Sequence, residues 1–298
     1  MASFSQTFVD PCSDAGFKAI FCDPANKGLL IDFLNMVLPS DRRIADLRYE
    51  TTEIPGVSLY NKAARLDLRC RDTLGRNFIV EVQNYWQEHF FRRCAYYAAR
   101  IYSYGVEKGD GQHYDVEPVF LVALLNANLG LDRKDSCWDG RYLSSYTFRE
   151  LYTGQVEDDT IFITFVELYR FRRQRFEDCA DAFEQLCWSL KNMQNTGSAP
   201  KGTLDLRLLD LWRAGEIAAF PEGKRAQYDT DMITERDHEN MMYSAEMKGR
   251  REGMAEGVAK GKAEGVAKVA RAMLAAGMPV EQIVALTGLT EEQVKGLE

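Results

Sequence analysis

Several features of common protein classes are scarce or missing in this chain of 298 residues. It has no run of about 18 apolar residues, so we expect no membrane-spanning helix. The cysteines number seven and no two have CxxC spacing, which favours a reducing, cytoplasmic setting over a disulfide framework. The three scattered histidines argue against a His-rich metal site. The first residues lack a basic start followed by an apolar core, so we expect no secretory signal.

Positively charged residues are also outnumbered by negatively charged ones, 37 to 45. The net charge of −8 argues against a surface that coats nucleic acid nonspecifically. The balance reverses locally, because residues 61–108 hold nine Lys or Arg and five Asp or Glu. This basic segment is where we look for a site that meets an anionic substrate.

The composition, 46% hydrophobic and 28% charged, is that of a globular protein. Hydrophobic periodicity predicts a helix at 27–38, strands within 43–50, 57–72 and 76–83, a helix at 85–108, a buried strand within 116–129, strands at 141–149 and 160–168, and helices at 176–193 and 204–220. The leading order is helix, three antiparallel strands, helix, strand. The sequence therefore predicts the α/β class.

Two of these strands, joined through residues 73–75, each carry an acid among apolar residues. Asp67 stands between two leucines and Glu81 between two valines. Side chains alternate between the faces of a strand, so Asp67 shares a face with Arg65, and Glu81 shares one with Gln83. Whether the two acids meet depends on the register of the pairing.

The turn chemistry selects that register. A two-residue loop would place Asp67 opposite Val80, whereas a three-residue loop, 73–75, places it opposite Glu81. Three-residue loops commonly end in a left-handed residue, a conformation that Gly75 adopts at little cost. We therefore expect the acids to face each other.

Opposed Cβ atoms of antiparallel strands lie roughly 4.5–5.5 Å apart, and two carboxylates so close raise one pKa unless a cation lies between them. Such oxygen ligands suit Mg²⁺ or Mn²⁺, which can activate water and neutralise a phosphodiester. Asp67 and Glu81 are thus predicted to form half of a divalent-metal site. The pattern equally fits a solvated strand face, with the acids balanced by Arg65 and Arg69. The register that places Asp67 opposite Glu81 would also place Arg65 opposite Gln83.

An acid on one strand, followed by Glu81-Val82-Gln83 on the next, resembles the motif of the PD-(D/E)xK nuclease superfamily. More closely, the chain resembles the PD-(D/E)xK transposases and recombination-promoting (Rpn-type) nucleases. The likeness covers nearly the whole chain and is carried by segments 13–21, 30–38, 65–83, 92–126 and 165–171 and by the Glu-Gly-rich C-terminus. It implies a restriction-endonuclease-like core with a helical C-terminal region.

The resemblance also implies roles for single residues. Asp67 and Glu81 would ligate Mg²⁺ or Mn²⁺, together with the Val82 carbonyl. Gln83 takes the place of the usual lysine, which positions or activates the attacking water. Glutamine can hydrogen-bond water but carries no charge, so lower activity is expected. The proline of the motif name is replaced by Leu66.

Four further residues are candidates for the site. Asp14 opens the "D..FK" pattern of the family and could be an auxiliary acid, or an N-cap or turn acid before a helix. Arg65, Arg92 and Arg93 are candidate phosphate contacts. The last two begin the helix after the motif strand, where they could instead only solvate the helix.

The C-terminal region has a separate pattern. Five glycines recur every fourth residue, at 249, 253, 257, 261 and 265. On a helix this spacing forms a smooth stripe that permits a close partner helix; the alternative is a flexible, partly helical linker. After it, Pro279 begins a short helix that Gly288 ends, and Thr290 caps another. This helix–turn–helix pattern is mostly acidic, which favours a protein contact over DNA.

Together these patterns predict a nuclease-like core over 1–170, a helical extension over 171–228, and a Glu/Gly-rich helix with a helix–turn–helix-like tail over 229–298. The resemblance implies a metal-dependent DNA endonuclease linked to transposition or recombination. The glycine stripe predicts a homo-oligomer formed through the C-terminal helical region. A degenerate relative that only binds DNA or protein, and an RNA nuclease, are the alternatives. Retention of both acids favours catalysis.

Overall fold

The computed structural model describes residues 6–54, 64–106, 116–130, 135–158, 160–203 and 205–297. The chain forms two compact units, residues 1–233 and 234–298. In the described residues, no helix has the length and apolarity needed to cross a membrane.

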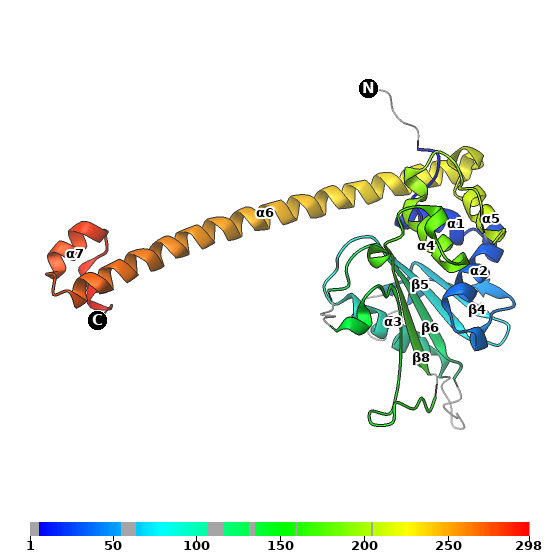
Figure 1. Ribbon diagram of the computed structural model, residues 1–298, viewed down its shortest axis with the longest axis horizontal. Coiled ribbons are helices and arrows are strands. Elements are labelled where there is room, and N and C mark those ends of the chain that lie inside the picture. The colour runs from blue at the N-terminus through cyan, green and yellow to red at the C-terminus, as the bar shows by residue number, and fades with distance from the viewer. Residues whose placement is uncertain are drawn as a thin grey trace. The chain divides into compact units, whose positions relative to one another are not determined.

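The first unit is built on a six-stranded sheet with the order β1-β4-β5-β6-β8-β7 (Figure 1). Its strands are β1 (Leu47–Tyr49), β4 (Leu68–Asp72), β5 (Asn77–Gln83), β6 (Val119–Leu125), β7 (Leu143–Thr147) and β8 (Ile161–Glu167). The first three pair antiparallel, β5, β6 and β8 pair parallel, and β7 is antiparallel to β8. A separate small sheet pairs β2 (Glu53–Ile54) with β3 (Ala64–Arg65).

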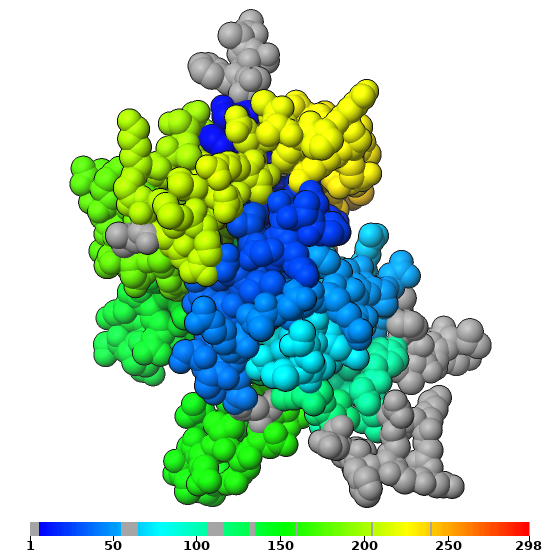
Figure 2. Space-filling model, turned by 90° about the vertical axis from the view of Figure 1, so that its right-hand side faces the viewer, coloured from blue at the N-terminus to red at the C-terminus, as the bar shows by residue number. Residues whose placement is uncertain are grey.

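Helices cover both faces of the large sheet. One face packs with α1 (Asp14–Phe21), α2 (Lys27–Val37), α4 (Ala182–Asn192) and α5 (Arg207–Ala214), and the other with α3 (Phe90–Gly105). On the surface seen in Figure 2, α1 and α2 (blue) lie beside α5 (yellow-green). The predicted α/β class is confirmed as a three-layer arrangement.

The core follows from the strand sequences. All seven residues of β6 are buried, as the continuous apolar run predicts for a strand covered on both faces. Alternate residues of β5 separate between the two core clusters, with Phe78 and Val80 on the α1 side and Ile79 on the α3 side. Glu81 therefore points toward the α3 side, two residues beyond Ile79.

Most predicted elements are confirmed, with shifts at their ends. The helix predicted from Tyr85 begins at Phe90, because His89 at its N-cap has a left-handed φ of 61° and interrupts the helical path. The helix predicted over 204–220 is regular only over α5 and is followed by Gly215. Residues 57–63 of one predicted strand, and 107–108 at the end of the predicted long helix, lie outside the described residues.

Short 3₁₀ turns connect several elements. They span Pro24–Asn26, Ser40–Arg42, Ser136–Trp138, Leu168–Arg170, Phe176–Asp178, Met193–Asn195 and Ile217–Ala219. The turn at Phe176–Asp178 occupies the start of the helix predicted over 176–193. Regular helix α4 begins only where the Asp181 carboxylate accepts a hydrogen bond from the Glu184 backbone N–H.

The second unit contains most of α6 (Glu222–Ala275), then α7 (Val280–Thr287) and α8 (Glu291–Lys295). The glycine-rich segment is thus helix, which corrects the linker alternative. The predicted caps are confirmed: Gly288 ends α7 with a φ of 72°, and Thr290 forms a capping box with Gln293. Ala270, Ile283 and Val294 form the centre of this small core.

Helix α1 was missed by periodicity, although the sequence holds its start signal. Ser13 is the N-cap, with its hydroxyl accepting a hydrogen bond from the Gly16 backbone N–H. Gly16 lies so close to the preceding turn that an added Cβ would fall 1.8 Å from the Asp10 carbonyl oxygen. The absence of a side chain at this position lets α1 pack where it does.

We predict that Gly16→Ala lowers the free energy of unfolding by about 2–4 kcal/mol, because the clash is with backbone that cannot rotate away. Gly28→Ala in α2 is the matched control, since a Cβ there meets nothing within 4 Å. It should be neutral or stabilising by up to about 1 kcal/mol. Urea denaturation of both variants is the measurement, and equal midpoints would contradict the packing described for Gly16.

Candidate functional site

The β4–β5 hairpin has the register that the turn chemistry predicts. Leu68 pairs with Val80, and each step along the strands keeps that offset. The three-residue loop ends at Gly75, which has a φ of 85° and donates its N–H to the Asp72 carbonyl at 3.1 Å. Continuing this register by one step brings Asp67 opposite Glu81.

The strand does not continue regularly past that point. Asp67 occupies a bend that separates β3 from β4. Arg65, before the bend, pairs with Glu53 of β2, so the expectation that Arg65 opposes Gln83 is wrong. The alternation of faces also fails there, because Leu66 packs in the α3-side cluster while Leu68 packs in the other.

The bend directs the Asp67 side chain toward the backbone of β5. Its Oδ2 accepts a hydrogen bond of 2.7 Å from the Val82 N–H, and its own N–H donates to Glu81 Oε1 at 3.4 Å. Glu81 is only 2% exposed. The two acids predicted from the register therefore form one local cluster of oxygen atoms, which we call the acid pair.

Burial shapes the electrostatics of the acid pair. Loss of water raises the pKa of Asp67 from 3.8 to about 6, an effect that the Val82 N–H opposes and the charge of Asp14 adds to. Burial, and then the charge of Asp67, raise the pKa of Glu81 well above its ordinary range. The pair consequently favours either a proton or a cation between its oxygens near neutral pH.

Gln83 and Arg93 form the polar wall beside the acid pair. Gln83 Oε1 accepts a hydrogen bond from Arg93 Nη2 at 3.0 Å, and Gln83 Nε2 donates to the Tyr85 carbonyl at 2.6 Å. The same Arg93 nitrogen lies 3.7 Å from Glu81 Oε2. Arg92, its neighbour on α3, is exposed, so the structure brings one of the two candidate arginines to the acids.

Asp14 reaches the site from α1. It is the first residue of that helix and forms an ion pair of 2.6 Å with Lys18, while Ser13 serves as the N-cap, so the N-cap alternative for Asp14 is wrong. Its charge contributes to the raised pKa values of both members of the acid pair. One turn beyond Lys18, the Cys22 thiol donates to the Asp67 carbonyl at 3.8 Å.

Lys18 and Cys22 are residues near the site that sequence reasoning missed. The signal was present, because Asp14, Lys18 and Cys22 recur at the four-residue spacing of one helix face after a good N-cap. Periodicity of apolar residues alone did not find this short helix, whose eight residues include five that are buried.

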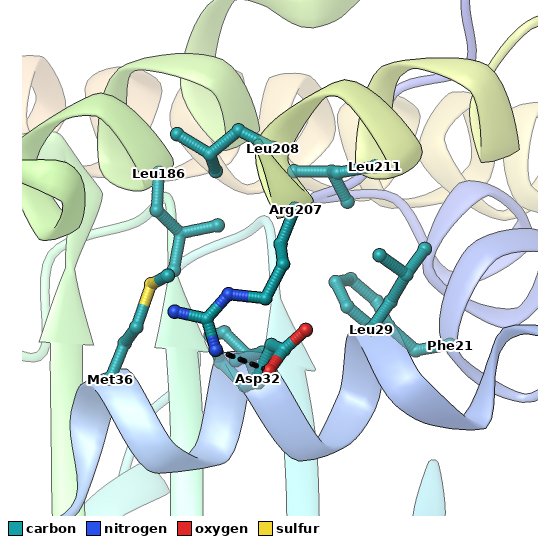
Figure 3. A pocket seen from close by; sticks show the side chains of 9 residues that line it. Phe21, Leu29, Asp32, Met36, Leu186, Arg207, Leu208 and Leu211 are labelled. Atoms are coloured by element: carbon teal, nitrogen blue, oxygen red, sulfur yellow. Dashed lines mark hydrogen bonds and ion pairs between the residues drawn. The ribbon is translucent and has the colours of Figure 1, made fainter. Parts of the chain in front are cut away.

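A small pocket lies elsewhere in the first unit, between α2 and α5 (Figure 3). Its lining is mostly apolar, with Leu29 and Met36 on one side and Leu208 on the other. Asp32 and Arg207 meet across it in an ion pair of 2.6 Å. The pocket contains none of the residues of the acid pair, and its two charges neutralise each other.

The acid pair offers hard oxygen donors from two carboxylates, and the backbone carbonyl of Val82 follows Glu81 on β5. Such donors fit Mg²⁺ or Mn²⁺, which usually keep several water ligands. Over the described ranges, no group of three or more His, Cys, Asp or Glu is arranged to hold a metal ion. A cation at the acid pair would therefore need ligands from solvent or substrate as well.

Comparison with known proteins gives two family matches. The model of the PD-(D/E)XK nuclease family transposase matches residues 11–245. The model of the Rpn/YhgA-like nuclease family C-terminal HTH domain matches residues 263–298, which include α7 and α8. No curated protein and no solved structure matches the chain.

The raised pKa of Asp67 generates a prediction about stability. Between the unfolded value of 3.8 and the folded value of about 6, the folded state holds a proton that the unfolded state releases, so stability falls as pH rises through this window. Asp67→Asn should remove that loss, stabilising the protein by about 1–3 kcal/mol at pH 8 and changing little below pH 4.

Thermal and urea unfolding in EDTA at the two pH values would measure this difference. The exposed Asp41 gives the control Asp41→Asn, for which we expect no comparable gain at pH 8. A gain from Asp67→Asn that is equal at both pH values would show that the buried charge is not its source.

Proposed function

The chain belongs to the PD-(D/E)XK nuclease family of transposases, and on that basis we propose that it is a metal-dependent DNA endonuclease acting in transposition or recombination of mobile elements. It would hydrolyse phosphodiester bonds at the acid pair. The single observation that carries the proposal is the contact of the half-buried Asp67 with the buried Glu81 in the motif register.

Mg²⁺ or Mn²⁺ is the cofactor we propose, held by the carboxylates of Asp67 and Glu81 and the carbonyl of Val82. When bound, such a cation lowers the pKa of coordinated water and neutralises charge on the phosphodiester. The protein holds its two anionic ligands in a poorly solvated place, where a cation offsets the loss of water that raises both pKa values and the charge of Asp67 that adds to the shift of Glu81.

The remaining residues of the site would bind and orient the substrate. Arg93 carries positive charge beside Glu81, and Gln83 is hydrogen-bonded to it. Asp14 and Lys18 form a neutral pair on the α1 side. The match of residues 263–298 to a helix–turn–helix domain supports a nucleic-acid partner in place of the protein contact expected from its acidic residues, and we propose that this partner is DNA.

We predict that the protein nicks supercoiled plasmid with Mg²⁺ or Mn²⁺ and not with EDTA. Asp67→Ala should lower the rate by about 10²–10³-fold or more, because it removes a metal ligand and exposes the charge of Glu81. The exposed Asp41→Ala is the matched control and should cut as wild type does.

The same assay distinguishes the alternatives. Cleavage by Asp67→Ala at the wild-type rate would place the activity at another site or in a contaminant. Binding of plasmid with no cleavage by wild type would favour a degenerate DNA-binding relative, and faster cleavage of RNA of matched sequence would favour an RNA nuclease.

We also propose that α6 pairs with the α6 of a second copy. Its glycines at 249, 253, 257, 261 and 265 are open, since an added Cβ at each would meet nothing within 4 Å. Exposed charges recur every fourth residue with alternating sign: Glu256, Lys260, Glu264 and Lys268. In an antiparallel pair centred on Lys262, each glutamate would lie level with a lysine of the partner helix.

This pairing predicts that Lys260→Glu with Lys268→Glu dissociates the oligomer, because like charges would then face each other. Adding Glu256→Lys and Glu264→Lys to the same chain should restore it. Light scattering at several concentrations measures the mass. If the wild-type chain has the mass of a monomer, or the charge reversal leaves an oligomer intact, α6 is not the contact.

A further inference from the structure

Arg93 is held beside the acid pair by packing as well as by hydrogen bonds. It is the fourth residue of α3, and its guanidinium lies 4.6 Å from the centre of the Phe90 ring and 5.8 Å from that of Tyr97. Side chains of an α-helix lean toward its N-terminus, which brings this guanidinium back over the end of β5. The aromatic rings fix its plane and leave its edge for polar contacts.

Three side-chain oxygens surround that edge. Arg93 Nη2 donates to Gln83 Oε1, Nη1 donates to Gln87 Oε1, and Nη2 also lies 3.7 Å from Glu81 Oε2. Arg93 Nε is buried without a hydrogen-bond partner. A ligand beside Glu81 would therefore meet the Nη edge of the guanidinium and not the buried Nε.

Both ends of the Gln83 amide take part in this arrangement. Its Nε2 donates to the Tyr85 carbonyl and its Oε1 accepts from Arg93, so the orientation of the amide is fixed at both ends. A glutamine that orients a water molecule would direct its amide toward the acids instead. The contacts of Gln83 serve the placement of Arg93.

We propose, on the basis of the proposed function, that Arg93 is the catalytic cation of this site and that Gln83 is its positioning residue. Arg93 would contact the scissile phosphate and supply the positive charge that a lysine at position 83 would otherwise carry. In the hydrolysis, a water oxygen bonds to phosphorus, one phosphorus–oxygen bond breaks, and the water proton ends on the departing hydroxyl or in solvent. The planar guanidinium suits the negative charge that builds on the phosphate oxygens.

Other cations near the acids are less suited to this role. The charge of Lys18 is matched by Asp14 at 2.6 Å. The backbone of Arg65 belongs to the small β2–β3 sheet and its side chain is exposed, and Arg92 is exposed one residue before Arg93 on α3. Arg93 also repels any cation held by Glu81, so the same residue should weaken metal binding while it promotes cleavage.

The opposite signs of these two effects define the experiment. Mn²⁺ binding to the full chain without DNA is measured by calorimetry, and nicking of supercoiled plasmid is measured at saturating Mn²⁺. Arg93→Met should lower the nicking rate about 10²-fold and tighten Mn²⁺ binding at least about threefold. The nicking rate of Arg92→Met should stay at least about tenfold higher than that of Arg93→Met.

The control for an arginine-to-methionine change is Arg213→Met on α5, where the side chain is 74% exposed and paired with Asp210. It should change neither measurement. Arg93→Lys keeps the charge without the planar fork and should retain activity between those of wild type and Arg93→Met.

The positioning role of Gln83 has its own test. Gln83→Met should lower nicking about tenfold, and Gln83→Met combined with Arg93→Met should be no slower than Arg93→Met alone, because the two act as one unit. Adding Gln83→Lys to Arg93→Met should raise the nicking rate at least about tenfold, because it returns a cation to the motif position.

The outcomes separate the inference from the function on which it rests. Wild-type nicking with an unaffected Arg93→Met, or Mn²⁺ binding that is unchanged by Arg93→Met, overturns the role of Arg93 and leaves the nuclease intact. A wild-type chain that does not cut overturns both. Should Arg93→Met fail to fold, Gln83→Met decides, and full activity in that variant overturns the proposal.

Discussion

The buried carboxylate of Glu81 and the half-buried Asp67 beside it are the constraint around which this part of the molecule is arranged. Taking Glu81 fully and Asp67 partly out of water costs free energy, and contacts from β5 and α3 reduce that cost. The strand bends so that Asp67 accepts the Val82 N–H, and α3 brings Arg93 within 3.7 Å of Glu81. The bend at Asp67, the position of α3 and the register of the hairpin together set the polar contacts that the two carboxylates make.

Much of the fold around the site could be predicted from the sequence, because it depends on residues that are close together in the chain. The three-residue loop ending at Gly75 is enough to predict the pairing of Leu68 with Val80, since loop length and turn type set the register of a hairpin. The continuous apolar run of β6 predicted a strand buried on both faces. The C-terminal caps at Gly288 and Thr290 were likewise predictable, since capping depends on a few neighbouring residues.

The parts that could not be predicted depend on contacts between distant segments. Alternation along a strand assumes a regular backbone, so it placed Arg65 opposite Gln83 and overlooked the bend at Asp67. Sequence patterns did not distinguish Arg92 from Arg93, which differ only in how α3 packs on the sheet. The approach of Asp14 required α1, a helix too short for a clear periodic pattern.

The hairpin loop has a consequence for how this protein can change over generations. Surface loops usually accept inserted or deleted residues with little harm. Here one residue added to or removed from the three between Asp72 and Arg76 would shift the pairing of β4 and β5 and exchange the faces of one strand. Glu81 would then no longer lie level with Asp67. A turn at the opposite end of the hairpin from the acids is therefore under a length constraint as strict as that on the core.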